Sequence, residues 1–254
     1  MAKSLIITAD DFGAAREVND AVEHAHRRGA LTAASLMVTG PAATDAIARA
    51  RAMPSLRVGL HLVLVDGRPA LPAAQIPSLV DADGFFRNGM ARAGAAMFFL
   101  PHVRRQLAAE IEAQFRAFAA TGLTLDHVNT HKHFQLHPTI GAMMMDIGKR
   151  HGARAARTLA FRGRFRRNGF LVPDRVYGLK WSGEMTLERV QAILDGLPEG
   201  LSEIYMHPAT GPYPGSAEGY RYADELAALQ ALQIPKDVRC GGFADFATGA
   251  KLAP

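Results

Sequence analysis

Short apolar runs alternate with longer amphipathic stretches along most of this chain. The short runs have the length and composition of buried strands, and the longer stretches repeat apolar side chains three and four positions apart, as an amphipathic helix does. In the stretch 14–28, this spacing is carried by Val18, Ala21, Val22 and Ala25. We predict strands at residues 4–9, 34–39, 57–65, 125–129, 153–159, 203–207 and 238–242, and helices at residues 14–28, 43–53, 102–121, 138–150, 186–197 and 222–233.

The alternation of strands with helices predicts an α/β fold with a parallel sheet, because parallel strands need crossover connections. From the pattern alone, this sheet is either an open doubly wound sheet or a closed barrel. No internal repeat or low-complexity linker divides the 254 residues, so we expect a single domain over residues 1–254. In both architectures the functional groups gather at the carboxyl ends of the strands.

The composition is that of an ordinary globular protein, with 48% hydrophobic and 21% charged residues. Cys240 is the single cysteine, which excludes an intramolecular disulfide and favours a reducing, cytoplasmic location. No stretch approaches the roughly 18 apolar residues of a membrane span. The apolar run at the N-terminus is too short for the core of a signal peptide.

The formal net charge is +5, and much of the excess lies in Arg104 and Arg105 and in a second cluster from Arg154 to Arg167. Such a patch can bind nucleic acid, anionic lipid or a phosphorylated substrate, but a solvated surface is more common. The sequence carries no helix-turn-helix, zinc-finger or RNA-binding signature, so we expect no nucleic-acid partner.

Acidic and imidazole side chains stand at the carboxyl ends of four predicted strands. An aspartate pair at a strand end, where the chain turns, can direct both carboxylates into one pocket. A cation beside the pair would relieve the repulsion between the two charges. The residues in question are Asp10, Asp11, His61, His131, His133 and His207.

Most of these residues also have a plain structural interpretation. Asp10 or Asp11 can cap the helix that begins near residue 14, and His61 can be a hydrogen-bonded histidine of the core. His131 and His133 are separated by one residue, which would project both to the same side of an extended segment. Neutral imidazole is a common ligand of zinc and other transition metals, so this pair favours a metal site.

One aspartate and two histidines can hold a divalent cation and leave positions open for water and substrate. Such a cation lowers the pKa of its bound water toward about 7 and polarises a carbonyl group. The second aspartate would then act as a base, and a histidine on the opposite side as an acid. This set of groups is sufficient to hydrolyse an amide or an ester.

The same residues resemble, in the same order and at fitting intervals, the motifs of the YdjC-like (ChbG-type) carbohydrate deacetylases. The matching segments are residues 8–13 (TADDFG), 59–61 (GLH), 130–133 (THKH) and 206–208 (MHP), and the resemblance runs over essentially the whole chain. It implies an irregular (β/α) barrel of about seven to eight mainly parallel strands, related to the eight-stranded barrels. It also implies that the chain hydrolyses an N-acetylated sugar.

The resemblance assigns a role to each of the residues at the strand ends. Asp10 corresponds to the catalytic base, and the metal ligands correspond to Asp11, His61 and His131. His207 is expected to act on the leaving group. The remaining histidine, His133, is expected to lie behind the ligands or to touch substrate.

The resemblance also implies one divalent metal ion as cofactor. Zinc is favoured because the ligands mix imidazole with carboxylate, and magnesium is the alternative because carboxylate and water also suit it. This chain has Asn129 where the family often has an acidic residue, two positions before His131. The difference leaves the ligands intact but changes a group that would orient them.

Within the family, the chain most resembles the hopanoid-biosynthesis-associated (HpnK) members, through residues 177–185 and an apolar insertion at 90–100. This likeness implies conversion of an N-acetylglucosaminyl hopanoid to its glucosaminyl form. We expect Trp181, Met97 and Phe98 to contact substrate, and residues 85–105 to form an apolar insertion or lid. The lid would bring a cytoplasmic protein into peripheral contact with the inner membrane. The alternative for this segment is a buried loop or the start of a core helix.

Other functions stay open at this point, among them a chitooligosaccharide deacetylase and a non-catalytic sugar- or lipid-binding protein on the same fold. A phosphoesterase often uses two metals about 3.5–4 Å apart, but the sequence supplies ligands for one convincing site. A glycosidase needs two carboxylates about 5–9.5 Å apart, whereas Asp10 and Asp11 are adjacent. The sequence does not indicate an oligomeric state.

Overall fold

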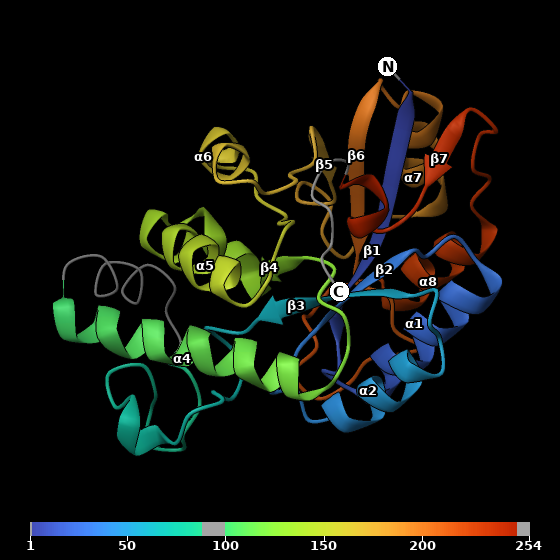
Figure 1. The fold of residues 1–254 in the computed structure, drawn as a ribbon. Coiled ribbons are helices and arrows are strands. Elements are labelled where there is room, and N and C mark those ends of the chain that lie inside the picture. Colours follow the sequence, from blue (N-terminus) through green and yellow to red (C-terminus); the bar gives the residue numbers. More distant parts are fainter. Residues whose placement is uncertain (1, 88–99, 248–254) are drawn as a thin grey trace.

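One sheet of parallel strands organises the computed structural model, which describes residues 2–87 and 100–247 (Figure 1). In spatial order, six of its seven strands are β4 (Val128–Thr130), β3 (Arg57–Leu62), β2 (Ala33–Leu36), β1 (Lys3–Phe12), β6 (Gly200–Met206) and β5 (Arg175–Tyr177). The seventh, β7 (Val238–Cys240), pairs with the first residues of β1. All the ladders between these strands are parallel, as the sequence pattern predicts.

Beyond β4 the pairing continues through isolated parallel bridges rather than full strands. Val128 pairs with Ala156, and Ala155 pairs with Leu171. Leu171 lies only four residues before Arg175, the first residue of the strand at the other edge of the sheet. The sheet therefore curls toward closure, as an irregular (β/α) barrel does and a flat doubly wound sheet does not.

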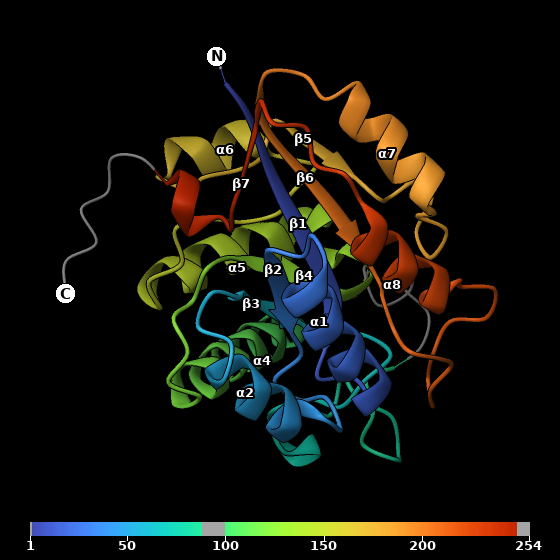
Figure 2. The ribbon, with the colours of Figure 1, turned by 90° about the vertical axis from the view of Figure 1, so that its right-hand side faces the viewer.

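Helices cover the outside of the sheet in both views (Figures 1 and 2). The first helix buries Val18, Val22 and Ala25 on one face, and two later helices begin with a proline, whose missing N–H is not needed in a first turn. None of the helices in the described ranges has both the length and the apolarity to span a bilayer. The helices are α1 (Arg16–Arg28), α2 (Ala43–Arg51), α4 (Pro101–Ala120), α5 (Pro138–Arg150), α6 (Arg162–Arg167), α7 (Leu187–Asp195) and α8 (Tyr222–Ala231).

The alternation of side chains along the strands separates two environments. One set packs into the main hydrophobic cluster together with the apolar faces of the helices, as Ile7 and Ile204 do. The other set faces the interior of the barrel. At the amino ends of the strands this interior is filled by a small apolar cluster of Ile6, Ala33, Ala155, Leu201 and Phe243. Above this apolar plug the buried interior side chains are polar, so the carboxyl ends of the strands are the end at which chemistry can occur.

Three local predictions differ from the structure. Residues 153–159 pair with neighbouring segments only through the isolated bridges at Ala155 and Ala156, so no regular strand forms there. The strand β5 and the helix α6 were not predicted, because three and six residues are too short to show a period. The chain after Thr130 is not extended: it forms a 3₁₀ segment, His131–Leu136, in which two residues have left-handed backbone angles.

The apolar plug yields a prediction about stability. Phe243 is 0% exposed, and its replacement by alanine should lower the free energy of unfolding by about 3–5 kcal/mol through a cavity and lost packing. Phe161, which is 46% exposed, is the matched control. Phe161→Ala should change the free energy of unfolding by less than about 0.5 kcal/mol. Urea unfolding of both variants measures the difference. Equal changes in the two variants would show that burial of Phe243 in the plug does not stabilise the fold more than an exposed phenylalanine does.

Candidate functional site

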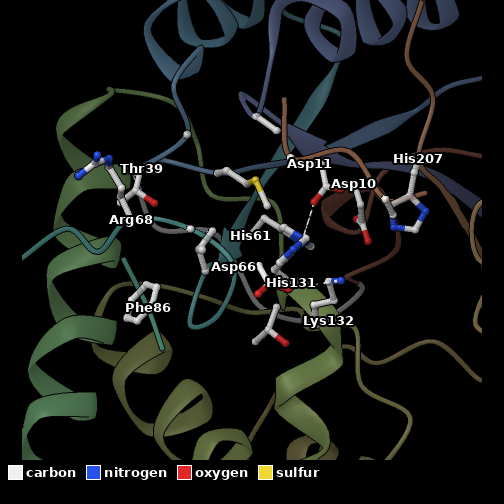
Figure 3. Close-up of a pocket in the computed structure, with 18 of the residues that line it drawn as sticks. Asp10, Asp11, Thr39, His61, Asp66, Arg68, Phe86, His131, Lys132 and His207 are labelled. Atoms are coloured by element: carbon white, nitrogen blue, oxygen red, sulfur yellow. Dashed lines mark hydrogen bonds and ion pairs between the residues drawn. The ribbon is translucent and has the colours of Figure 1, made fainter. Parts of the chain in front are cut away.

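A cavity of about 1040 Å³ opens at the carboxyl ends of the strands. All six of the acidic and imidazole residues singled out from the sequence line it, and they come from four different strand ends (Figure 3). Arg68 and Phe86 lie on the opposite wall. The six residues are Asp10, Asp11, His61, His131, His133 and His207.

A bulge in β1 brings two successive carboxylates into the same cavity. The register between β1 and β2 shifts between Ala9 and Phe12, and Asp11 has a φ of 62°, in the left-handed region. In a regular strand, Asp10 and Asp11 would point to opposite faces. The strand continues to Phe12, so this bulge, and not a turn after the strand, lets both carboxylates face the cavity. The left-handed conformation of a non-glycine residue costs about 1–3 kcal/mol, which the surrounding structure must offset.

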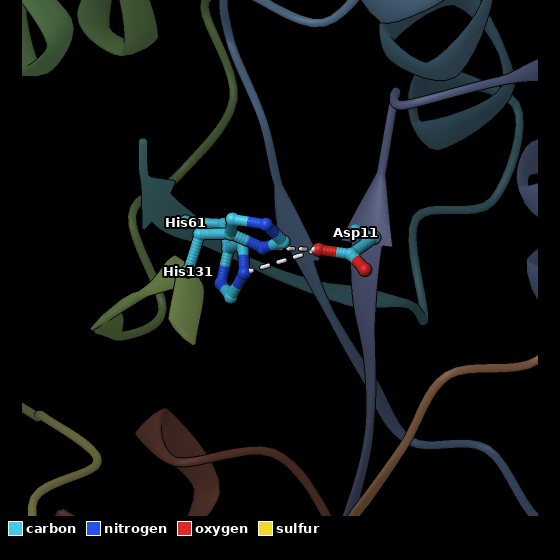
Figure 4. Close-up of side chains that lie close together, drawn as sticks. All are labelled: Asp11, His61 and His131. Atoms are coloured by element: carbon cyan, nitrogen blue, oxygen red, sulfur yellow. Dashed lines mark hydrogen bonds and ion pairs between the residues drawn. The ribbon is translucent and has the colours of Figure 1, made fainter. Parts of the chain in front are cut away.

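Asp11, His61 and His131 converge on one point (Figure 4). One possible ligand atom from each residue lies within 4.8 Å of the others. Asp11 Oδ1 is 3.3 Å from Nε2 of His61 and 3.0 Å from Nδ1 of His131. The three residues predicted as metal ligands therefore form a candidate metal site, with a carboxylate and two imidazoles as the donor set.

The hydrogen bonds behind His61 fit a cation at this site. Its Nδ1 lies 2.7 Å from Oδ1 of Asn129, an oxygen that only accepts, so Nδ1 carries the proton and Nε2 presents a lone pair. In the neutral ring that lone pair faces the Asp11 carboxylate, and two acceptors at this distance repel unless a proton or a metal ion lies between them. Burial lowers the pKa of His61, but the carboxylates of Asp10 and Asp11 outweigh it and raise the pKa above its usual value. The site thus favours a positive charge.

His131 and His133 both line the cavity, but the segment that carries them is not extended, so the prediction of an extended pair is wrong. Lys132 and His133 have φ values of 54° and 56°, and these left-handed residues turn the chain between the two rings. His133 lines the cavity, and its Nε2 is 2.8 Å from the hydroxyl of Tyr205. Burial and the nearby Arg157 lower the pKa of His133 to about 4, so its ring is neutral at physiological pH.

Asp10 is held by Arg157, a residue that the sequence analysis assigned to a solvated basic cluster. Arg157 is only 1% exposed; its Nη1 donates to Asp10 at 2.5 Å, and its Nε and Nη2 donate to Glu203 at 2.9 and 2.7 Å. Burial raises the pKa of the Asp10 carboxyl, but Arg157, followed by His61 and His207, pulls it well below its usual value. The other arginines of the cluster, such as Arg164 and Arg167, are exposed. No feature of the sequence distinguishes Arg157 from them.

His207 reaches the cavity just after β6, across from the candidate ligands (Figure 3). Its backbone N–H donates to the buried carboxylate of Glu225, which also accepts the backbone N–H of Met185. Its ring lies edge-on to Tyr205 and Tyr220, at centroid distances of 5.8 and 5.4 Å. Nδ1 of His207 is buried and has no hydrogen-bond partner among the described residues.

The cavity does not account for all the residues predicted to contact substrate. Trp181 is partly buried against the core and is not among the described residues that line the cavity. Met97 and Phe98 lie outside the described residues. The end of the expected lid, residues 101–105, forms the first turn of α4. Aromatic and apolar side chains do line the cavity, and among them Phe85 and Leu179 are also exposed at its rim.

Comparison with known proteins places the chain among related sequences. A family model described as YdjC-like protein matches residues 4–239. A carbohydrate deacetylase of Geobacillus stearothermophilus is 34% identical over 236 residues, covering 90% of this chain and 90% of that protein. A carbohydrate deacetylase of Brevibacillus brevis is 30% identical over 236 residues, covering 91% and 92%.

A solved structure shares the fold over nearly the whole chain. It comes from Enterococcus faecalis V583 and is described as a proposed cellobiose-phosphate cleavage protein. It superposes with a TM-score of 0.80 at 24% identity, covering 98% of this chain and 100% of that chain. At this level of identity the likeness shows the fold alone.

The convergent cluster predicts metal binding that depends on one histidine of the 130–133 motif and not on the other. We expect the wild-type chain to bind one zinc ion, and His131→Ala to lose stoichiometric binding because one of three ligands is removed. His133→Ala is the matched control and should keep the ion. Titration calorimetry on metal-free protein, with elemental analysis, measures both. Full zinc content in His131→Ala would refute this ligand set.

Proposed function

We propose that this chain, which belongs to the YdjC-like protein family, is a metal-dependent hydrolase that removes the acetyl group from an N-acetylglucosamine-type sugar. The observation that carries this proposal is the arrangement of Asp10 and His207 around one candidate metal site within a single cavity. An amide hydrolase needs a base for water, stabilisation of the carbonyl oxygen and an acid for the leaving amine. This cavity offers a group for each need.

The residues of the chain divide the work of the reaction. A divalent cation held by Asp11, His61 and His131 would lower the pKa of water and polarise the acetyl carbonyl. Asp10 accepts the proton of the attacking water; its carboxylate is kept ionised by Arg157 and aimed by hydrogen bonds. The water oxygen bonds to the acetyl carbon and the carbon–nitrogen bond breaks. His207 gives a proton to the leaving amine, and acetate is the second product.

The cavity supports a substrate larger than one sugar ring. At about 1040 Å³ it lies at the upper end of typical ligand pockets of about 300–1,000 Å³. Its lining includes the aromatic side chains of Tyr213, Tyr220, Phe85 and Phe86. Aromatic faces suit both a second sugar and an apolar aglycone. We propose the N-acetylglucosaminyl hopanoid as the specific substrate, with an acetylated chitooligosaccharide as the second candidate and peripheral membrane contact as a corollary of the first.

Asp10→Asn separates catalysis from metal binding. The amide keeps the shape but cannot take a proton, so we expect activity to fall by about 10²–10⁴-fold with zinc content unchanged. Mass spectrometry of the zinc-loaded enzyme with N-acetylglucosaminyl hopanoid, and separately with a chitooligosaccharide, counts the acetyl groups lost. Loss from the oligosaccharide alone would remove the hopanoid proposal. Absence of loss from either substrate in the wild-type enzyme, with zinc bound, would favour a non-catalytic binding protein.

Arg157→Met should move the acid limb of the pH–activity profile to higher pH. In the wild type, Arg157 holds the pKa of Asp10 below its usual value; without that charge, burial raises it. The base is active only when ionised, so the variant loses activity at a pH where the wild type keeps it. The wild-type pair also stabilises the fold above the ordinary aspartate pKa, and this stability fades as pH falls through the lowered value.

The control for this shift is Arg167→Met, which removes an exposed arginine of the same cluster and should leave the profile unchanged. Breaking the buried ion pair should also destabilise the fold by about 3–5 kcal/mol, so thermal unfolding must first establish that the Arg157→Met protein is folded at the assay temperature. An unchanged acid limb in the folded variant would contradict the role given to Arg157.

A further inference from the structure

A continuous chain of hydrogen bonds crosses the interior of the barrel behind His61. Nδ1 of His127 lies 2.9 Å from Oδ2 of Asp126, and its Nε2 lies 3.0 Å from Oγ of Ser35. Ser35 Oγ in turn lies 2.9 Å from Nδ2 of Asn129. All of these residues are buried, so their polar atoms must satisfy one another.

The hydrogen bonds between these four residues all have the same donor-to-acceptor direction, which runs from Asn129 toward Asp126. The Asp126 carboxylate accepts the backbone N–H groups of Phe243 and Ala244, at 3.1 and 2.9 Å, which marks it as the accepting end. His127 therefore donates from Nδ1 and accepts at Nε2. The hydroxyl of Ser35 gives its hydrogen to His127 and can then only accept from Asn129.

This direction fixes which way the amide of Asn129 faces. Its Nδ2 donates one hydrogen to Ser35 and the other toward Oδ1 of Asp10, at 3.2 Å, and both of these oxygens are acceptors. The amide oxygen must then face His61 and accept its Nδ1–H. A rotated amide would place its oxygen against the carboxylate of Asp10 and the lone pairs of Ser35. The tautomer that turns Nε2 of His61 toward Asp11 follows from this orientation.

The ring of His127 has no room to reorient. A Cβ atom at Gly59 would lie 2.5 Å from the ring atoms of His127, so only glycine permits this packing. On the other side Phe243 stacks on the ring at a centroid distance of 4.4 Å and an interplanar angle of 24°. Packing therefore holds the ring of His127 in place in addition to its hydrogen bonds.

We propose that Ser35 and His127 are positioning residues that lock the amide of Asn129, and through it hold His61 in the tautomer that binds the metal. Neither residue touches the candidate metal site directly. The metal-binding part of this inference rests on the proposed function, whereas the tautomer of His61 can be observed without metal and without substrate.

Ser35→Ala tests the inference with the smallest change. It removes one of the two acceptors for the Asn129 amide and the donor for His127, so only Asp10 then opposes rotation of the amide. Ser35→Thr restores the hydroxyl and is the conservative rescue. Ser202→Ala is the matched control: Ser202 is also a fully buried strand serine, but its Oγ has no hydrogen-bond partner among the described residues. His127→Phe, which keeps the ring volume and loses both nitrogens, is a second test at the origin of the chain.

Two readouts follow these variants. Long-range proton–nitrogen correlation spectra of the metal-free protein, recorded at a pH at which the His61 ring is neutral, report which ring nitrogen carries the proton. Competition with a chelator reports zinc affinity. We expect Ser35→Ala and His127→Phe to populate both tautomers and to lower zinc affinity about tenfold, the lower end of the range for groups that orient metal ligands. Ser35→Thr and Ser202→Ala should behave as the wild type.

A single unchanged tautomer in folded Ser35→Ala and His127→Phe would overturn the inference, even if their melting temperatures fell. Equal effects of Ser35→Ala and Ser202→Ala would also overturn it, because the loss would then reflect packing. Failure of the proposed function is a separate result: a wild-type chain that deacetylates neither substrate can still show the tautomer shift, which leaves the inference standing.

Discussion

The guanidinium of Arg157 joins the carboxylates of Asp10 and Glu203 inside the barrel, and the geometry of the site depends on this buried ion pair. Removing Arg157 would leave two buried carboxylates without their cationic partner, which is strongly destabilising. The planar fork of arginine reaches both groups at once, which a lysine ammonium does less well. The consequence is a carboxylate that is ionised and fixed before substrate arrives, so it need not reorganise during the reaction.

Strained backbone marks the same end of the barrel. Asp11, Lys132 and His133 all have left-handed angles, which ordinary residues adopt at a cost of about 1–3 kcal/mol each. At Asp11 the strain breaks the alternation of the strand and gives two neighbouring carboxylates one cavity. At Lys132 and His133 it sends two nearby imidazoles to different partners. In both places an unusual backbone angle aims a side chain that a regular strand would point elsewhere.

Asn129 shows why an amide suits a position between His61 and Asp10. It accepts a hydrogen from His61 with its oxygen while its nitrogen faces the carboxylate of Asp10. A carboxylate could orient His61 equally well, but it would repel Asp10 across the same distance. The amide thus connects the group proposed as base with a proposed ligand. An amide can rotate by half a turn and exchange its oxygen and nitrogen. The hydrogen bond to Ser35 opposes this rotation.

The sequence by itself determined the parallel α/β fold, because strand and helix periodicity is local. It also determined that acidic and imidazole side chains gather at the strand ends, because parallel strands bring their carboxyl ends together. Within that group, the resemblance to a known family singled out Asp11, His61 and His131 as the ligands. Tertiary structure decided the rest. Arg157 meets Glu203 and Asp10 across 46 and 147 positions of sequence, and nothing local separates it from the exposed arginines around it. The bulge at Asp11 and the turn at His133 are backbone conformations that non-glycine residues adopt only when packing over-determines them. Only the folded chain buries Arg157, and burial beside Asp10 makes this arginine part of the candidate active site.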